Sequence, residues 1–214
     1  MTTTQKNQAP TPMGYARLVL ADGTVFAGRG LGATGESLGE LCFNTAMTGH
    51  QEILADPSYA GQIVCFTFPH VGNVGTNEDD EEAACGRAQI AATGMVMRAE
   101  MTDPANYRAT KHFDDWLKAR GIIAVSGVDT RAITRRIRES GMPMAVIAHS
   151  RTDQFDLDQL KARARDANSM EGRELAADVM SSGDTDWSEG DWIWNEGHST
   201  GPADGPLVAV LDYG

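Results

Sequence analysis

The sequence is short of basic residues and contains no long hydrophobic run. Its 214 residues include 18 Lys and Arg against 30 Asp and Glu, which gives a formal net charge of −12. Such a chain lacks the basic surface that neutralises nucleic-acid phosphates or binds anionic lipid. The longest apolar stretches, such as residues 63–68, are far shorter than the roughly 20 residues that span a bilayer. The sequence therefore predicts a soluble protein that binds neither nucleic acid nor membrane.

Cysteine is too sparse for a disulfide framework or a zinc site. Cys42, Cys65 and Cys85 contain no CxxC pair, and their odd number fits a reducing compartment. Cys42 and Cys65 lie in apolar runs, where a free cysteine behaves as a small buried hydrophobic residue. Residues 1–12 are polar and contain proline without an apolar core, so we expect a flexible tail and not a signal peptide. These features favour a cytoplasmic protein.

The common catalytic motifs are also missing. The sequence has no GxxxxGK[ST] phosphate loop, no HExxH, no GxSxG and no glutaminase nucleophile motif. Gly30-x-Gly32-x-x-Gly35 has the spacing of a dinucleotide fingerprint, but strand-like residues follow it where that fingerprint needs a helix. His50 and His70 have no carboxylate or cysteine in register, so we predict no metal site. The residues alone define no catalytic set.

Hydrophobic patterning indicates a mixed α/β chain. An Asp-Gly turn within residues 15–30 predicts a β-hairpin, and further strands are expected at residues 39–46, 62–68, 94–98, 122–125 and 144–148. Helices are expected at residues 48–55, 113–120, 129–140 and 156–167. The pattern Thr48-x-x-Gln51 predicts a capping box at the start of the first helix.

The helix expected at residues 129–140 is amphipathic. Ile133 and Ile137 face inward, while Arg131, Arg135 and Arg138 share one exposed stripe at helical spacing.

The segment at residues 181–206 is acidic and contains no Lys or Arg. We interpret it as a linker laid over a surface, because it can bury little while Trp187, Trp192 and Trp194 suggest packing. Residues 207–211 (LVAVL) then predict a buried strand.

Two loops attract attention. Ser58 follows the rigid Asp56-Pro57 turn, where its hydroxyl can cap the local backbone or face a ligand, and the residues alone favour the cap. Residues 69–77 form a loop without periodicity that is long enough to suggest function. The acidic run at residues 78–82 is interpreted as solvated, because consecutive side chains do not converge on one point.

Four runs, taken together and in order, resemble the small (glutamine amidotransferase) subunit of carbamoyl phosphate synthetase. They are residues 43–52 (FNTAMTGHQE), 56–59 (DPSY), 69–77 (PHVGNVGTN) and 127–135 (GVDTRAITR). The resemblance extends over residues 15–214 and is weakest in the Trp-rich segment.

The resemblance implies an α/β (mixed β/β/α) fold, namely the swivelling N-terminal domain of that family, over residues 15–150. It leaves a tail over residues 1–14 and a helical, Trp-rich acidic linker over residues 151–206. Residues 207–214 (LVAVLDYG) resemble the first strand of the family's C-terminal class I glutaminase domain, which this chain otherwise lacks.

The implied function is that of a cytoplasmic heterodimer. In it the small subunit hydrolyses glutamine and delivers ammonia to a large subunit, which makes carbamoyl phosphate for arginine and pyrimidine synthesis. The resemblance implies no cofactor on this chain, and ATP and Mg on the large subunit. The family's cysteine nucleophile lies in the C-terminal domain, and Cys42, Cys65 and Cys85 do not match its Gly-flanked context. We therefore expect no catalytic residue in this chain and no glutaminase activity from it alone.

The resemblance also changes the expectation for individual residues. Ser58 aligns with the serine that contacts glutamine in the family. The expected contacts with the large subunit are Thr45, Met47, Thr48, His50, Gln51, His70, Asn73 and Asn77. The alternative is a non-catalytic docking module for the large subunit, and a free-standing small-molecule binding protein has no support in the sequence.

Overall fold

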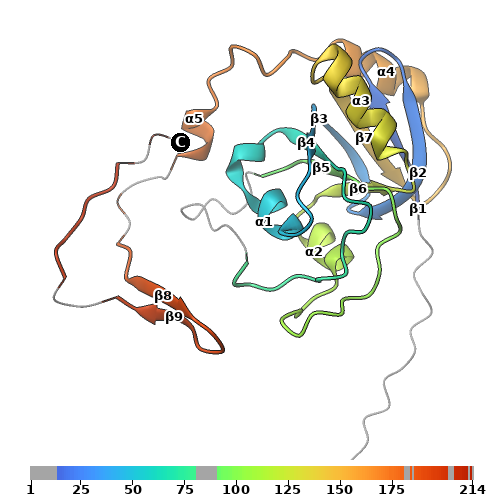
Figure 1. Cartoon of the computed structure of the whole chain (residues 1–214). Helices are drawn as coiled ribbons and strands as arrows, with labels where there is room; N and C mark the ends of the chain where they lie inside the picture. The colour runs from blue at the N-terminus through green and yellow to red at the C-terminus, as the bar shows by residue number, and fades with distance from the viewer. Residues whose placement is uncertain are drawn as a thin grey trace, which may run out of the picture.

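Seven strands close into a small barrel (Figure 1). The computed structural model describes residues 14–80, 91–180, 184, 186–201, 205–211 and 213. The barrel strands are β1 (Gly14–Leu20), β2 (Val25–Gly32), β3 (Gly35–Asn44), β4 (Gln62–Phe66), β5 (Gly94–Val96), β6 (Ile123–Ser126) and β7 (Met144–Ser150). Their order around the barrel is β1-β2-β6-β5-β4-β3-β7, so none of these strands has a free edge.

The helices lie outside the barrel. They are α1 (His50–Ala55), the 3₁₀ turn η1 (Pro57–Tyr59), α2 (Phe113–Ala119), α3 (Thr130–Ser140), α4 (Leu157–Arg165) and α5 (Ala176–Val179). A separate hairpin is formed by β8 (Glu189–Ile193) and β9 (Gly197–Thr200). No helix in the described part of the chain is both long and apolar enough to cross a membrane.

The barrel combines two kinds of strand pairing. β1 pairs antiparallel with β2, as the Asp-Gly turn predicts, and Gly23 takes a left-handed φ of 85° in that turn. β3, β4, β5 and β6 run parallel, with α1 in the connection from β3 to β4 and α2 in the connection from β5 to β6. The mixed α/β class expected from the sequence is confirmed.

Apolar side chains fill the barrel interior. Alternate residues of the strands point inward and meet α3, whose Ile133 and Ile137 pack against this interior cluster. The buried members are Ala16, Leu18, Leu20, Leu41, Ile63, Cys65, Val96, Ile123, Val125, Val128, Ala145 and Ile147. The inward orientation expected for Ile133 and Ile137 is therefore confirmed.

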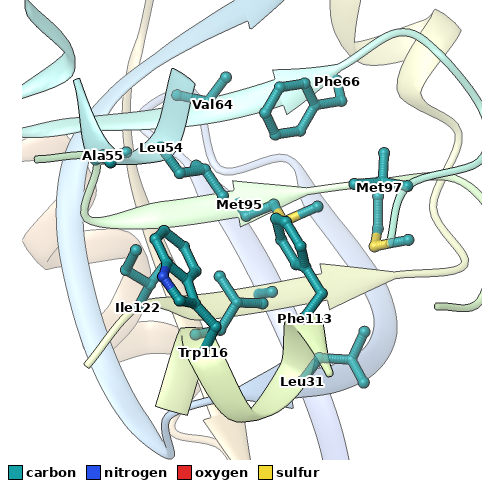
Figure 2. Close-up of a cluster of buried hydrophobic side chains, with 14 of the residues drawn as sticks. Leu31, Leu54, Ala55, Val64, Phe66, Met95, Met97, Phe113, Trp116 and Ile122 are labelled. Atoms are coloured by element: carbon teal, nitrogen blue, oxygen red, sulfur yellow. The ribbon is translucent and has the colours of Figure 1, made fainter. Parts of the chain in front are cut away.

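A second cluster covers the outside of the parallel strands. Figure 2 shows Leu54 of α1 and Phe113 and Trp116 of α2 packed around Met95 of β5. The Phe113 and Trp116 rings lie 5.6 Å apart. A third, smaller cluster joins α4 to the outer face of β1 and β7. Burial on both faces explains why the parallel strands are continuous apolar runs in the sequence.

The glycines of the fingerprint-like motif serve the barrel and not a nucleotide. A side chain at Gly30 would overlap the imidazole ring of His149, and one at Gly32 would overlap the carbonyl oxygen of Ile122. Gly35 has a φ of 126°, a conformation that L side chains rarely adopt. The strand β3 begins at this glycine, so the helix that a pyrophosphate site requires is replaced by a strand.

Three local expectations differ from the structure. The capping box is wrong, because α1 is capped by Gly49 and the N-terminal cap has no side-chain hydrogen bond. The linker contains the β8–β9 hairpin, which its composition did not indicate. The strand expected at residues 207–211 is not formed, and Leu207 is 99% exposed.

Candidate functional site

Ser58 lies in the middle of a stiff turn between α1 and β4. The carboxylate of Asp56 accepts a hydrogen bond of 2.7 Å from the backbone N–H of Ser58. The backbone N–H of Tyr59 donates to the Asp56 carbonyl at 3.0 Å. The Tyr59 hydroxyl accepts a 2.9 Å hydrogen bond from the Asn44 amide, which ties the turn to the end of β3. Proline at the first position of η1 further restricts the backbone.

The Ser58 hydroxyl itself is not used by the turn. Asp56, and not Ser58, caps η1, so the capping role that the residues alone favoured for Ser58 is wrong. The side chain is exposed, and its hydroxyl makes no hydrogen bond with any residue in the described ranges. A hydroxyl held on a rigid turn and open to solvent can bind a polar ligand with little ordering cost. The contact with glutamine stays a prediction.

Gln51 and Asn77 join α1 to the loop of residues 69–77. The Gln51 amide donates to the Asn77 carbonyl at 2.6 Å, and its oxygen accepts from the Asn77 N–H at 3.0 Å. Both residues are buried. The Asn77 side chain accepts from the N–H groups of Asp79 and Asp80, which continues the network past the loop. These two residues hold the segments together, so neither offers its side chain as a surface contact.

The other residues expected to contact the large subunit divide by exposure. Thr45, Met47, Thr48 and Asn73 are exposed, whereas His70 is half-buried with its Nε2 3.0 Å from the Thr102 hydroxyl. The fold therefore brings the exposed members of the 45–51 and 69–77 segments to the surface on either side of the Gln51–Asn77 bond. Their contact with a partner stays a prediction.

His50 is enclosed by aromatic rings at the start of α1. Its ring meets Phe66 edge-on at 4.8 Å and stacks on Phe68 at 6.4 Å between centroids. Burial lowers the pKa of His50 below its ordinary value, because the charged imidazolium is poorly solvated there. His50 is consequently a core residue of α1 and not a surface contact.

A hollow of about 300 Å³ lies between α1, the glycines of the 72–77 loop and Arg108. Arg108 crosses it with its guanidinium 2.9 Å from Asp80 and 3.5 Å from Asp79. The same guanidinium lies 5.3 Å from the ring centre of Trp192 on β8. Tyr107 and Trp194 stack at 5.7 Å beside it, so two of the three tryptophans pack on this surface, as the sequence suggested. Trp187 remains 75% exposed.

The described cysteines are buried and protonated. Burial raises the pKa of Cys42 to about 11 and that of Cys65 to about 12. Both behave as the small hydrophobic residues that the sequence predicts. Cys85 lies outside the described residues, as do Glu81 and Glu82 of the acidic run. In the ranges that the structure describes, no three His, Cys, Asp or Glu side chains gather as a metal site would require.

Sequence reasoning missed the residues that support the Ser58 turn and the loop. Asn44, Tyr59 and Arg108 carry no periodic or motif signal for these roles, since each acts on a partner distant in the sequence. Only the Asp56-Pro57 pair, which predicts a turn, indicated the stiffness of this region.

Comparison with known proteins identifies the family. The sequence profile of "Carbamoyl-phosphate synthase small chain, CPSase domain" matches residues 18–147. The carbamoyl phosphate synthase small chain of Maricaulis maris is 63% identical over 197 residues, which cover 92% of this chain and 50% of that protein. The small chain of Mesorhizobium japonicum is 54% identical over 214 residues, covering 100% of this chain and 53% of that protein.

The chain therefore belongs to the carbamoyl-phosphate synthase small chain family, and the resemblance found in the sequence is confirmed. It spans about half the length of the curated relatives it matches. A solved aminopeptidase from Aneurinibacillus sp. overlaps 67% of this chain with a TM-score of 0.35 and 12% identity, a likeness too slight to bear on the fold.

Proposed function

We propose that this chain acts within a glutamine-dependent carbamoyl phosphate synthetase, as the part of the small subunit that docks on the large subunit and forms one side of the glutamine pocket. The whole subunit would hydrolyse glutamine and pass ammonia to the large subunit. The observation that carries the proposal is the Ser58 turn, because its stiff backbone holds an exposed hydroxyl that the fold itself does not use.

The chemistry of such a contact is straightforward. A serine hydroxyl can donate to the carboxylate of an amino acid or accept from its ammonium group, and hydrogen bonds to charged groups are the stronger ones. Asp56, Pro57 and Tyr59 restrict the turn before any ligand arrives, so binding orders little additional chain. A pocket completed by another domain would then form at a domain boundary, where small-molecule sites are common.

We further propose that residues 1–214 alone do not hydrolyse glutamine. A cysteine nucleophile must be available as the thiolate near neutral pH. Cys42 and Cys65 are buried, and their pKa values of about 11 and about 12 keep them as thiols. This supports the expectation that the nucleophile belongs to the glutaminase domain, where the family resemblance places it.

Partners and cofactors follow from the same proposal. The large subunit is the expected protein partner, and it would hold ATP and Mg, while this chain holds no cofactor. The pathways would be arginine and pyrimidine synthesis in the cytoplasm. Membrane and nucleic acid are not expected partners, given the net charge of −12.

Reconstitution tests the proposal directly. The native protein, isolated at its natural length, is mixed with the large chain of carbamoyl phosphate synthetase, ATP and bicarbonate. Carbamoyl phosphate formation is then followed with either glutamine or ammonia as nitrogen source. We expect glutamine to support synthesis only when both chains are present, and a mixture that uses ammonia but never glutamine would contradict the glutaminase role.

The docking-module alternative predicts a different protein. The intact mass of the native chain separates the two, because a native chain of only 214 residues would bring no glutaminase domain. In that case the protein would still bind the large chain, but glutamine would not replace ammonia in the reconstituted reaction.

A further inference from the structure

The exposed face of α3 carries a stripe of arginines on an otherwise acidic chain. Arg131, Arg135 and Arg138 are exposed and lie four and three residues apart, which places them on neighbouring turns of one helix side. The opposite side buries Ile133 and Ile137. We call these three residues the arginine stripe. The chain as a whole has a net charge of −12, so the stripe is a local reversal of its sign.

The stripe is only partly neutralised by its surroundings. Arg135 has a single, long ion pair of 3.8 Å with Glu139. Across the described part of the chain, Arg131 and Arg138 form no ion pair. The neighbouring Arg136 differs from them, because it is paired with Asp22 in the β1–β2 turn. The stripe thus presents guanidinium groups that the fold leaves available.

The stripe also works against the helix that carries it. Arg131 lies in the first turn, where the helix dipole favours acidic side chains. α2 has Asp114 and Asp115 in that turn and α4 has Asp158, whereas α3 has no acidic residue there. Arginines spaced three and four residues apart also repel one another. The helix is stabilised instead by the Asp129 cap and the buried isoleucines. A sequence that breaks its local rules without a structural gain indicates a functional surface.

We propose that the arginine stripe docks on an acidic face of the large chain of carbamoyl phosphate synthetase. The inference rests on the proposed function and adds a contact surface to the 45–51 and 69–77 segments. Guanidinium groups form bidentate bonds with carboxylates, so a protein surface rich in Asp and Glu is the complementary partner. Nucleic acid is disfavoured, because the rest of this chain is even more negative than the whole and would repel a phosphate backbone.

The position of α3 makes this contact separate from the Ser58 turn. In Figure 1, α3 lies across one end of the barrel and stands apart from α1, which leads into that turn. A partner that binds both surfaces would hold the barrel at two places. Exposed charge pairs at the edge of an interface mainly affect association and its salt dependence.

Charge reversal in the native protein tests the inference. We compare the wild type with a triple variant, R131E/R135E/R138E, and measure the Kd for the large chain at low and high NaCl concentrations. A matched control, R151E/R165E/R173E, changes the net charge equally at three exposed arginines elsewhere. We expect roughly ten- to a hundredfold weaker binding for the stripe variant at low salt, a much smaller difference at high salt, and less than about a twofold change for the control.

Further variants and probes keep the test decisive. A neutral variant, R131Q/R135Q/R138Q, should give an intermediate loss, and circular dichroism should show unchanged helix content in all variants. Equal affinity of the stripe variant and the wild type would overturn the inference while leaving glutamine-dependent synthesis intact. Binding of single-stranded RNA that the stripe variant loses, with unchanged affinity for the large chain, would also overturn it. A wild type that does not bind the large chain at all would overturn the proposed function first.

Discussion

Gln51 and Asn77 are joined in both directions, by a side-chain amide on α1 and the backbone of a loop 26 residues further along the chain. The Asn77 N–H and carbonyl are buried, and the Gln51 side chain satisfies both. Since α1 leads directly into the Ser58 turn, this pair fixes the turn and the loop in one arrangement.

Replacement of Gln51 by alanine should therefore lower the free energy of unfolding by about 2–4 kcal/mol, because two buried backbone groups lose their partners. Urea unfolding of the native protein measures the change. Gln159→Ala, on the exposed side of α4, is the matched control and should change the free energy by less than about 0.5 kcal/mol. Similar small effects for the two variants would contradict the role assigned to Gln51.

The same residue shows where sequence reasoning stops. Thr48 and Gln51 have the spacing of a capping box, and a local pattern predicts a local bond. The structure uses Gln51 for a distant loop, because a buried N–H and carbonyl are costly without a partner. No pattern within α1 reveals that partner, since Asn77 is brought near only by the fold.

His50 should make stability depend on pH. Its pKa is lowered by burial in the folded protein, so below the ordinary value of 6.5 the unfolded chain binds a proton that the folded chain does not. The free energy of unfolding is therefore expected to fall between pH 7.5 and pH 5.5, by at most about 1.4 kcal/mol per pH unit from this group.

The variant His50→Phe removes this titration and keeps an aromatic ring beside Phe66. Its free energy of unfolding should change less over the same pH range than that of the wild type. His70→Gln, at a half-buried position, is the control and should keep the wild-type slope. An unchanged slope in His50→Phe would show that other groups cause the pH dependence.

Gly30 should not tolerate a side chain. A Cβ at this position overlaps the His149 ring, which is held by a 2.9 Å contact between its Nδ1 and the Ala33 carbonyl. Gly30→Ala should cost about 1–3 kcal/mol through overpacking. In a His149→Ser background the same substitution should cost much less, and a double-mutant cycle from urea unfolding checks this. Additive effects would contradict the proposed clash.

Cys42 and Cys65 should be nearly unreactive in the folded protein. Both thiols are buried, and their pKa values of about 11 and about 12 leave little thiolate at neutral pH. Alkylation by iodoacetamide at pH 7.5, followed by peptide mass spectrometry, should be on the order of a hundredfold slower than in urea. Rapid labelling of either cysteine under native conditions would argue against this buried, protonated state.

The barrel could be predicted largely from the sequence, and the hairpin at its periphery could not. Residues 62–66 and 123–126 are apolar on both faces, and the Asp-Gly turn before β2 specifies a hairpin, so the main strands were found. The residues of β8 and β9 are acidic and exposed, and their hairpin includes Asn195 with a left-handed φ of 64°. Residues 207–211 are apolar enough for a core strand, yet in the described chain nothing pairs with them.

The candidate site was found in part for the same reason. The run around Ser58 was recognised through its resemblance to a family, whereas its geometric support by Asn44 and Tyr59 depends on tertiary contacts. His50, Gln51 and Asn77 were expected at an interface because they lie within the same runs. Their burial shows that residues within one motif serve both the fold and the surface.

The kinetic consequence of removing the Ser58 hydroxyl tests the central claim most directly. In the native protein combined with the large chain, Ser58→Ala should weaken glutamine use by roughly 1.5–3 kcal/mol, or about 10- to 150-fold. Ammonia-dependent synthesis should remain at the wild-type rate, since the turn is capped by Asp56 and needs no hydroxyl. A glutamine KM equal to that of the wild type would contradict the placement of Ser58 in the glutamine pocket.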